Sequence, residues 1–322
     1  MRLEVIAAGV VLISACGTPS GTDAGTDAGS DAGTMMTTDA GQVVGTLQIL
    51  HTVSQFGDSS SFFGKVYDGP TPLTTLFTAD LVDGDCRVET PRVPFCATPC
   101  GGSAACVEDN VCQAYPTSRN MGTLSASGLL VGGVVTPFEM TPINNGYQAP
   151  ASVTLSIPPF TDGALLGVTA SGSGAVGPFT VVGTGVAPIT LSQASDAGTW
   201  ALAPNTALDL QWTAGSTATA ARIEVEIDIS HHGGLRGQIL CDTADDGSLT
   251  IGGTLTTRLI NLGVSGFPTM KVRRIKKSST GRVDFKVVSG TEVGLTIPGL
   301  TSCTDDSECP MGQTCQTDLR CQ

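Results

Sequence analysis

Residues that could carry chemistry are few in this 322-residue chain. The sequence contains no Gly-x-Ser-x-Gly elbow, no His-Glu-x-x-His motif and no Walker loop, so the commonest signatures of hydrolases, zinc proteases and nucleotide-binding proteins are missing. Its three histidines are His51, His231 and His232. Adjacent residues of a strand point to opposite faces, so His231 and His232 are interpreted as loop residues that do not bind one metal together. The sequence predicts no catalytic residue and no metal site.

Two groups of aspartates offer the remaining candidate chemistry, namely Asp80, Asp83 and Asp85 in one group and Asp242, Asp245 and Asp246 in the other. Carboxylates in such groups suit a calcium site or the carboxylate pair of a glycosidase. Aspartates are also common turn residues, and this interpretation is favoured. We therefore expect no cofactor, with calcium as the alternative.

Basic residues gather in one short stretch of an acidic chain. Seven of the 16 lysines and arginines lie between positions 271 and 286, and five of them form a candidate anion-binding patch: Lys271, Arg273, Arg274, Lys276 and Lys277. Such a patch would suit an anionic glycan or a lipid headgroup. The favoured alternative is an edge hairpin whose lysines prevent sheets from pairing edge to edge.

Eleven cysteines are too many for a reducing cytosol and indicate an oxidising compartment. Without Cys16, ten disulfide candidates remain: Cys86, Cys96, Cys100, Cys106, Cys112, Cys241, Cys303, Cys309, Cys315 and Cys321. Zinc is disfavoured, because the first five lie in a stretch without histidine or a Cys-x₂-Cys pair. Parity suggests that Cys241 pairs with one of these five, and spacing leaves the connectivity open. The last four repeat the six-residue spacing of Cys100, Cys106 and Cys112.

Composition points to a β-rich fold. Charged residues make up 14% of the chain and aromatic residues 5%, with 41 glycines and 18 prolines, which favours short strands joined by turns. The formal net charge of −13 argues against a nucleic-acid partner, because the phosphate backbone demands lysine and arginine. We predict an all-β fold: an antiparallel β-sandwich, jelly-roll or Ig-like, over 43–300, with a disulfide-rich insertion at about 83–120 and a small disulfide-rich module over 301–322.

Hydrophobic alternation is clearest over 221–230, where Ile223, Val225 and Ile227 share one predicted face of a strand and acidic residues share the other. Hairpins are predicted from 238–243 to 248–254 and from 270–277 to 283–287. Residues 163–195 carry no charge and are interrupted by prolines and glycines. This pattern indicates sheet buried on both faces rather than a membrane helix.

The first residues of the chain predict an export signal. Arg2 precedes a short apolar run, and Leu12-Ile13-Ser14-Ala15-Cys16 resembles the lipobox of bacterial lipoproteins. The resemblance implies that residues 1–15 are a signal peptide and that Cys16 is lipidated, and Gly17 after it implies the outer membrane. Thr-Asp-Ala-Gly units then recur, so 16–42 is expected to be a lipidated, disordered tether.

Lipobox, tether, β body and cysteine-rich tail together resemble lipoproteins common in myxobacteria. Cysteine-rich modules of this kind resemble short repeats of secreted proteins, where they act as protein-contact or spacer units. We expect an exported, membrane-anchored lipoprotein that acts as a non-catalytic binding or structural module at the cell envelope, on its periplasmic or outer side. Its expected partners are the membrane, through the lipid anchor, and an envelope protein or glycan. The alternative is a glycan-active hydrolase on a jelly-roll fold, which is disfavoured because sugar sites usually have more exposed rings than the two tryptophans, Trp200 and Trp212, would supply.

Overall fold

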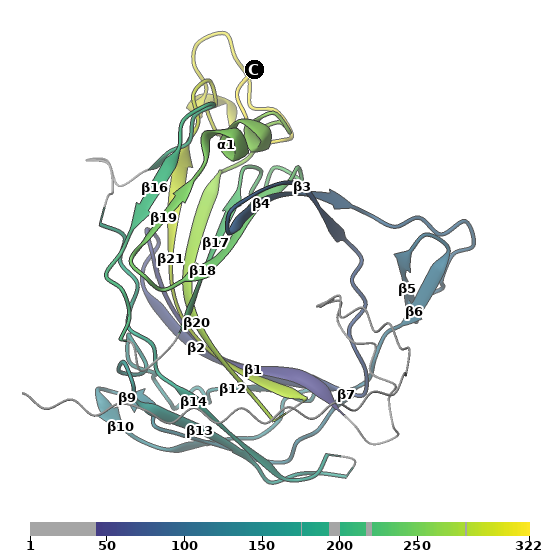
Figure 1. The fold of residues 1–322 in the computed structure, drawn as a ribbon. Helices are drawn as coiled ribbons and strands as arrows, with labels where there is room; N and C mark the ends of the chain where they lie inside the picture. Colours follow the sequence, from purple (N-terminus) through teal and green to yellow (C-terminus); the bar gives the residue numbers. More distant parts are fainter. Residues whose placement is uncertain (1–42, 175, 193–199, 217–220, 281) are drawn as a thin grey trace, which may run out of the picture. The chain divides into compact units, whose positions relative to one another are not determined.

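The computed structural model describes residues 43–174, 176–192, 200–216, 221–280 and 282–322 (Figure 1). The expected signal peptide over 1–15 and the expected tether over 16–42 lie outside these residues. All described residues belong to one unit, Thr38–Gln322. Within the described ranges, no helix is both long enough and apolar enough to cross a bilayer.

An 11-stranded sheet dominates the fold (Figure 1). Its strands pair in the order β12 (Gly146–Gln148), β2 (Ser59–Tyr67), β1 (Val44–Ser54), β21 (Val283–Thr296), β20 (Thr269–Ser279), β17 (Arg222–Asp228), β18 (Gln238–Ala244), β4 (Cys86–Arg92) and β3 (Leu76–Asp83). Two short strands complete the sheet: β15 (Trp200–Ala201) pairs with β21, and β7 (Ser118–Arg119) pairs with β2. The all-β prediction is confirmed, and β20 and β21 form the hairpin predicted over 270–287.

One central pairing of this sheet runs parallel. β1 and β21 lie side by side with Ile49 opposite Val287, so the first and last long strands of the unit are neighbours. Most of the chain separates these two strands, so no tight turn forces them to be antiparallel. The predicted antiparallel sheet is therefore mixed, with parallel pairs at β1–β21 and β15–β21.

A second, four-stranded sheet packs on one face of the long sheet and makes the predicted sandwich. Its order is β11 (Phe138–Met140), β8 (Leu124–Ser127), β13 (Leu165–Ala170) and β14 (Phe179–Thr184). Ile49 and Phe285 from one sheet meet Leu166 and Val181 from the other in an apolar core. Gly183 allows this close approach, because a Cβ atom there would lie 2.8 Å from the Phe285 ring.

Both β13 and β14 bury alternate residues only. The expectation that 163–195 forms sheet buried on both faces is therefore wrong for these strands. Their exposed side holds uncharged residues such as Thr169, Thr180 and Val182. Because neither face carries a charge, the alternation of buried and exposed residues cannot be recognised from charge.

A second apolar core lies under the other half of the long sheet. Ile223, Val225 and Ile227 point into it, as their alternation predicts. The core is closed by β16 (Leu208–Gln211), which pairs with β19 (Ser248–Ile251), and by helix α1 (Gly253–Ile260). The predicted hairpin from 238–243 to 248–254 is wrong, because β18 pairs with β17 and β4 whereas β19 pairs with β16. Between β18 and β19 the chain therefore leaves the long sheet and enters the two-stranded sheet of β16 and β19.

The remaining short elements are β9 (Leu130–Val131) with β10 (Val134–Val135), β5 (Ala104–Glu108) with β6 (Val111–Ala114), and the 3₁₀ helix η1 (Asp306–Glu308). The disulfide Cys86–Cys241 joins the neighbouring strands β4 and β18. Because β3 and β4 belong to the long sheet, the cysteine-rich insertion begins after Arg92 rather than near residue 83.

Candidate functional site

The long sheet has one face packed on the two cores, and we call the opposite side its outer face. On this outer face, Arg273 donates a hydrogen bond to Glu224 at 2.7 Å and lies 3.0 Å from Glu226. Lys271 lies 3.9 Å from Glu226. Two residues of the predicted anion-binding patch are therefore neutralised by the acidic side of β17.

The remaining two residues of the patch, Lys276 and Lys277, lie on opposite faces of β20. Lys277 is exposed on the outer face opposite Lys286, whereas Lys276 is half-buried and lies opposite Val287, a residue of the first apolar core. The interpretation as an aggregation-blocking edge hairpin is wrong, because β20 pairs with β17 on one side and with β21 on the other. The strands at the ends of the sheet are β12 and β3.

Arg274 is not part of any surface patch, because its side chain is fully buried on the core face. All five N–H donors of its guanidinium have acceptors. The carboxylate of Asp245 accepts at 2.7 and 2.9 Å, and the carbonyl oxygens of Ala187, Pro188 and Thr213 accept at 2.9, 3.1 and 2.7 Å. A buried arginine needs such a complete set, since an uncompensated charge in the core is costly. Arg274 thereby ties β20 to the segments that cover the sheet.

Arg274 also begins a row of polar residues between the two apolar cores. It lies opposite Ser289 of β21, which lies opposite His51 of β1. His51 in turn lies opposite Ser60 of β2. We call Arg274, Ser289, His51 and Ser60 the polar row. Nδ1 of the buried His51 lies 3.0 Å from Oγ of Ser289. Burial lowers the pKa of His51, because the charged imidazolium loses its hydration, and the Asp58 carboxylate partly opposes this shift.

A groove of about 500 Å³ lies at the outer face where β17, β20 and β21 meet the tail module. Phe56 and Phe267 contribute apolar walls, and His231, His232 and Glu292 contribute polar ones. Space for the groove arises partly because a glycine of β21, Gly294, lies opposite Thr269. The sequence does not point to Phe56, Thr269 or Glu292, because only the fold brings them together.

His231 and His232 follow the end of β17. Their ring centroids lie 4.0 Å apart, with the planes tilted by 50°. His232 adopts the left-handed conformation, with φ of 64°, which ends the alternation of the strand. The loop interpretation agrees with the structure, and the argument that the two rings would point to opposite faces does not apply to them.

Four of the six candidate aspartates, Asp80, Asp242, Asp245 and Asp246, have separate partners. Asp80 pairs with Arg258, Asp242 accepts from Arg222 at 2.8 Å and Asp245 accepts from Arg274. The carboxylate of Asp246 accepts from the backbone N–H of Ser248 at 3.2 Å, as in an aspartate turn. Carboxylates held one by one in this way are not grouped around a common ion.

The two tryptophans lie inside the second core, with Trp200 6% and Trp212 5% exposed. Nε1 of Trp212 donates to Asp245 at 2.8 Å. Neither ring is available to stack on a sugar, so the geometry does not favour the hydrolase alternative.

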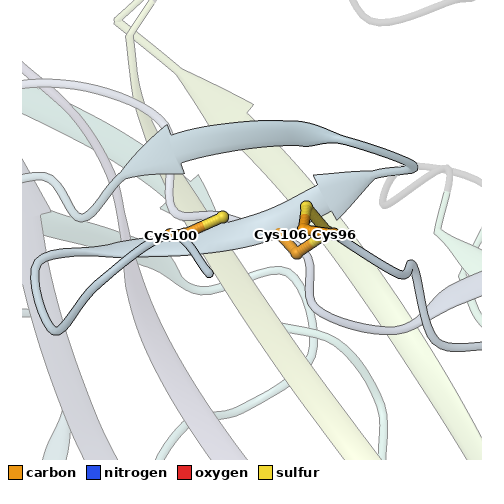
Figure 2. A group of neighbouring side chains, drawn as sticks. All are labelled: Cys96, Cys100 and Cys106. Atoms are coloured by element: carbon orange, nitrogen blue, oxygen red, sulfur yellow. A yellow bond between two sulfur atoms is a disulfide. The ribbon is translucent and has the colours of Figure 1, made fainter. Parts of the chain in front are cut away.

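All ten cysteines of the described residues form disulfides. Besides Cys86–Cys241, the pairs are Cys96–Cys106, Cys100–Cys112, Cys303–Cys315 and Cys309–Cys321. The sulfur atoms of the group in Figure 2 lie within 4.8 Å of one another. Thiolates rather than disulfides ligate metals, so this cluster has a structural role.

The insertion and tail modules have the same connectivity, in which the first cysteine pairs with the third and the second with the fourth. Each module also places a left-handed residue four positions after its third cysteine, namely Asn110 with φ of 63° and Leu319 with φ of 60°. The tail module docks on the body through Gly266, whose backbone N–H donates to the carbonyl of Asp318 at 2.8 Å. The two segments therefore share one pattern of disulfide pairing.

A scan of protein-family models finds no match to this chain, and a search of curated protein sequences finds none either. Among solved structures, the chain matches the crystal structure of chicken CNTN1 FN1-FN3 domains at 10% identity. The match covers 76% of this chain and 70% of that one, with a TM-score of 0.17. The description of the fold therefore rests on the strands and their pairing.

Proposed function

We propose that this protein is an exported lipoprotein, anchored through Cys16 to the outer membrane, that acts as a non-catalytic binding or structural module at the cell envelope. The observation that carries the proposal is the cysteine count. Five disulfides use all ten cysteines of the described residues, and the eleventh is the lipobox cysteine.

Five disulfides favour an oxidising compartment, since thiols stay reduced in the cytosol. A cysteine that has no disulfide partner within such a chain calls for another chemical role. Lipidation supplies one for Cys16, because the residue follows a short apolar run and small residues. Several acyl chains would hold the protein firmly, at about 0.8 kcal/mol per buried CH₂ group.

The architecture of the protein and the state of its carboxylates support a binding or structural role. Its sheets form a sandwich that carries two cysteine-rich modules, and the candidate carboxylates Asp80 and Asp245 are held in ion pairs. Envelope proteins and glycans are the partner classes proposed for this surface.

Intact mass of the protein purified from membranes, with and without reductant, tests the anchor and the disulfides together. We expect a chain that begins at Cys16 and carries a diacyl or triacyl adduct, and a gain of about ten hydrogens on reduction, two for each disulfide. A chain that keeps Met1 and has free thiols would contradict export.

Two variants localise the anchor. Cys16→Ser should move the protein from the membrane fraction to the soluble fraction while its disulfides still form. Gly17→Asp keeps the lipidated cysteine, and by the sorting rule for lipoproteins it should shift the protein to the inner membrane. An unchanged distribution of Cys16→Ser would refute lipid anchoring, and an unchanged distribution of Gly17→Asp would refute that sorting rule for this protein.

A further inference from the structure

We propose that the outer face of β2, β1, β21 and β20 binds an anionic glycan. This inference rests on the binding role proposed above, to which it adds a site and a chemical class of ligand, and it does not depend on lipid anchoring. Three features of the outer face support it: lysines without acidic partners, an exposed aromatic ring beside them, and amide side chains in the same row.

A row of side chains crosses these strands, because residues opposite one another in neighbouring strands share a face. Lys277 of β20 lies opposite Lys286 of β21, which lies opposite Gln48 of β1. Gln48 lies opposite Phe63 of β2, and Phe63 lies opposite Gln148 of β12. We call these five residues the outer row. Its length is roughly 19 Å at the usual spacing between strands, which suits several units of an extended sugar chain.

The outer row points away from the cores. Leu47 and Ile49, on either side of Gln48 along β1, belong to the first apolar core, so Gln48 points to the opposite face. Lys277 is exposed, and Lys286 and Gln48 are half-buried. Because β2, β1, β21 and β20 are each paired on both sides, a ligand on this face meets side chains and not free backbone groups. Addition of a peptide as an extra strand is therefore not available here.

The two lysines of the outer row are not neutralised. In the described part of the chain, the ion pairs of lysines and arginines include neither Lys277 nor Lys286. By contrast, Lys271 of the same strand β20 lies 3.9 Å from Glu226. At physiological salt, charges more than about 8 Å away are largely screened, so the local lysines determine what this face attracts even though the chain is acidic overall.

Phe63 supplies the apolar surface on which a sugar ring can lie. It is 55% exposed, although its strand is paired on both sides. Lys65 follows two residues later on the same face, and its Nζ atom lies 5.5 Å from the centre of the Tyr67 ring, a cation–π contact that orients the ammonium group. These three side chains and Thr46 line a hollow of about 260 Å³. Asp284 lies opposite Thr46, so three lysines here face one carboxylate.

This combination of groups favours a glycan over other anions. The amides of Gln48 and Gln148 can both donate to and accept from sugar hydroxyls, and the lysines can pair with carboxylate or sulfate groups. Duplex DNA carries a charge about every 1.7 Å along its axis, which three lysines do not match. Acidic glycans carry their charges further apart, with hydroxyls and C–H groups between them.

Calorimetric titration of the full-length, oxidised Cys16→Ser chain tests the proposal. The probes are oligosaccharides of polygalacturonate and of heparin, with methyl-esterified polygalacturonate, polyphosphate and phosphatidylglycerol vesicles as comparisons. We expect binding of an anionic oligosaccharide that added salt weakens, and no binding of the ester. Absence of binding to both anionic oligosaccharides would overturn the proposal and leave export and anchoring untouched. Equally tight binding of polyphosphate or of the vesicles would also overturn it, because the face would then attract anions of any kind.

Matched lysine variants test whether the outer row is the site. Lys277→Gln and Lys286→Gln should each weaken binding about tenfold, since each removes a charge-assisted hydrogen bond. Lys271→Gln is the control, because it removes the same charge from the same face at a lysine that already faces Glu226. It should bind within about twofold of the parent. Equal losses for all three variants would mean that only net charge matters, and would overturn the site.

The aromatic ring is tested at constant charge. Phe63→Ala should weaken binding about tenfold, and this loss should persist at high salt, where the lysines are screened. Phe56→Ala removes a ring that is 87% exposed in the turn between β1 and β2, and it should bind as the parent does. Circular dichroism establishes that each variant is folded. Full binding by folded Phe63→Ala would overturn a glycan site built on this ring.

Discussion

The sheet-on-sheet core and the polar row beside it are built from the same strands in opposite ways. In the core, Ile49 of β1 and Val287 of β21 lie opposite one another and belong to one cluster of buried apolar side chains. Two residues further along each strand, His51 and Ser289 lie opposite one another and are equally buried. In the core, stability comes from buried apolar area and close packing. In the polar row, it depends on whether each polar group has its hydrogen-bond or ion-pair partner.

This difference matters because the two kinds of burial respond differently to mutation. An apolar core loses free energy in proportion to the volume removed. A polar row loses little when a group without a partner is removed, and much when one partner of a pair is removed. The following substitutions test that contrast, beginning with the largest expected effect.

Arg274→Ala should destabilise the protein by about 3–5 kcal/mol, because it leaves the carboxylate of Asp245 buried without its counter-charge. Urea denaturation measures the change. Asp245→Leu combined with Arg274→Met should recover only part of the loss, since Trp212 and Gly215 also donate to Asp245. Arg222→Ala, which breaks an exposed ion pair with Asp242, is the control and should cost about 1 kcal/mol or less. Equal losses for Arg274→Ala and Arg222→Ala would refute the role of the buried pair.

Leu166→Ala should destabilise the sandwich core by about 2–5 kcal/mol, through lost burial and the cavity left behind. The neighbouring Leu165 provides a matched control, because it lies on the other side of β13 and is 74% exposed. Leu165→Ala should change the free energy of unfolding by no more than about 0.5 kcal/mol. Similar midpoints in urea for the two variants would show that the four-stranded sheet does not pack as described.

The apolar regions were predictable from the sequence because alternation identifies them without reference to distant partners. Ile223, Val225 and Ile227 are the clearest case. Arg274 could not be identified in this way, since it stands among basic residues that do face outward. Only the fold brings Arg274 to Asp245, a residue that the sequence predicts in the turn of a hairpin. A charged residue can be predicted to be buried only once its partner in the fold is known.

The groove illustrates the same limit. His231 and His232 were noticed because histidine is scarce, but the left-handed turn that brings their rings together has no signature in a histidine pair. Thr269 and Glu292 join them only through the pairing of β20 with β21. The disulfide-rich character of the insertion and tail followed from cysteine number, whereas the shared connectivity needed coordinates.

Two serines of the polar row should respond in opposite ways. Ser289→Ala removes the partner of His51 and should cost about 1–3 kcal/mol. Ser60 has a buried hydroxyl without a partner, so Ser60→Ala should be neutral or stabilising by up to about 1 kcal/mol. Thermal unfolding of both variants measures the difference. A loss for Ser60→Ala as large as that for Ser289→Ala would mean that the hydroxyl of Ser60 has a partner in solution.

His51 should make the protein less stable in mild acid. Its pKa is lowered by burial, so above about pH 6.5 the imidazole is neutral in both the folded and the unfolded chain. As the pH falls below that value, the unfolded chain takes up a proton that the folded chain does not, and the free energy of unfolding decreases until the lowered pKa is reached. Urea midpoints between pH 8 and pH 5 should show this decrease in the parent and a smaller one in His51→Gln, an amide that still forms hydrogen bonds but does not titrate. The same slope in both proteins would assign the acid sensitivity to other groups and leave the polar row as a purely structural feature.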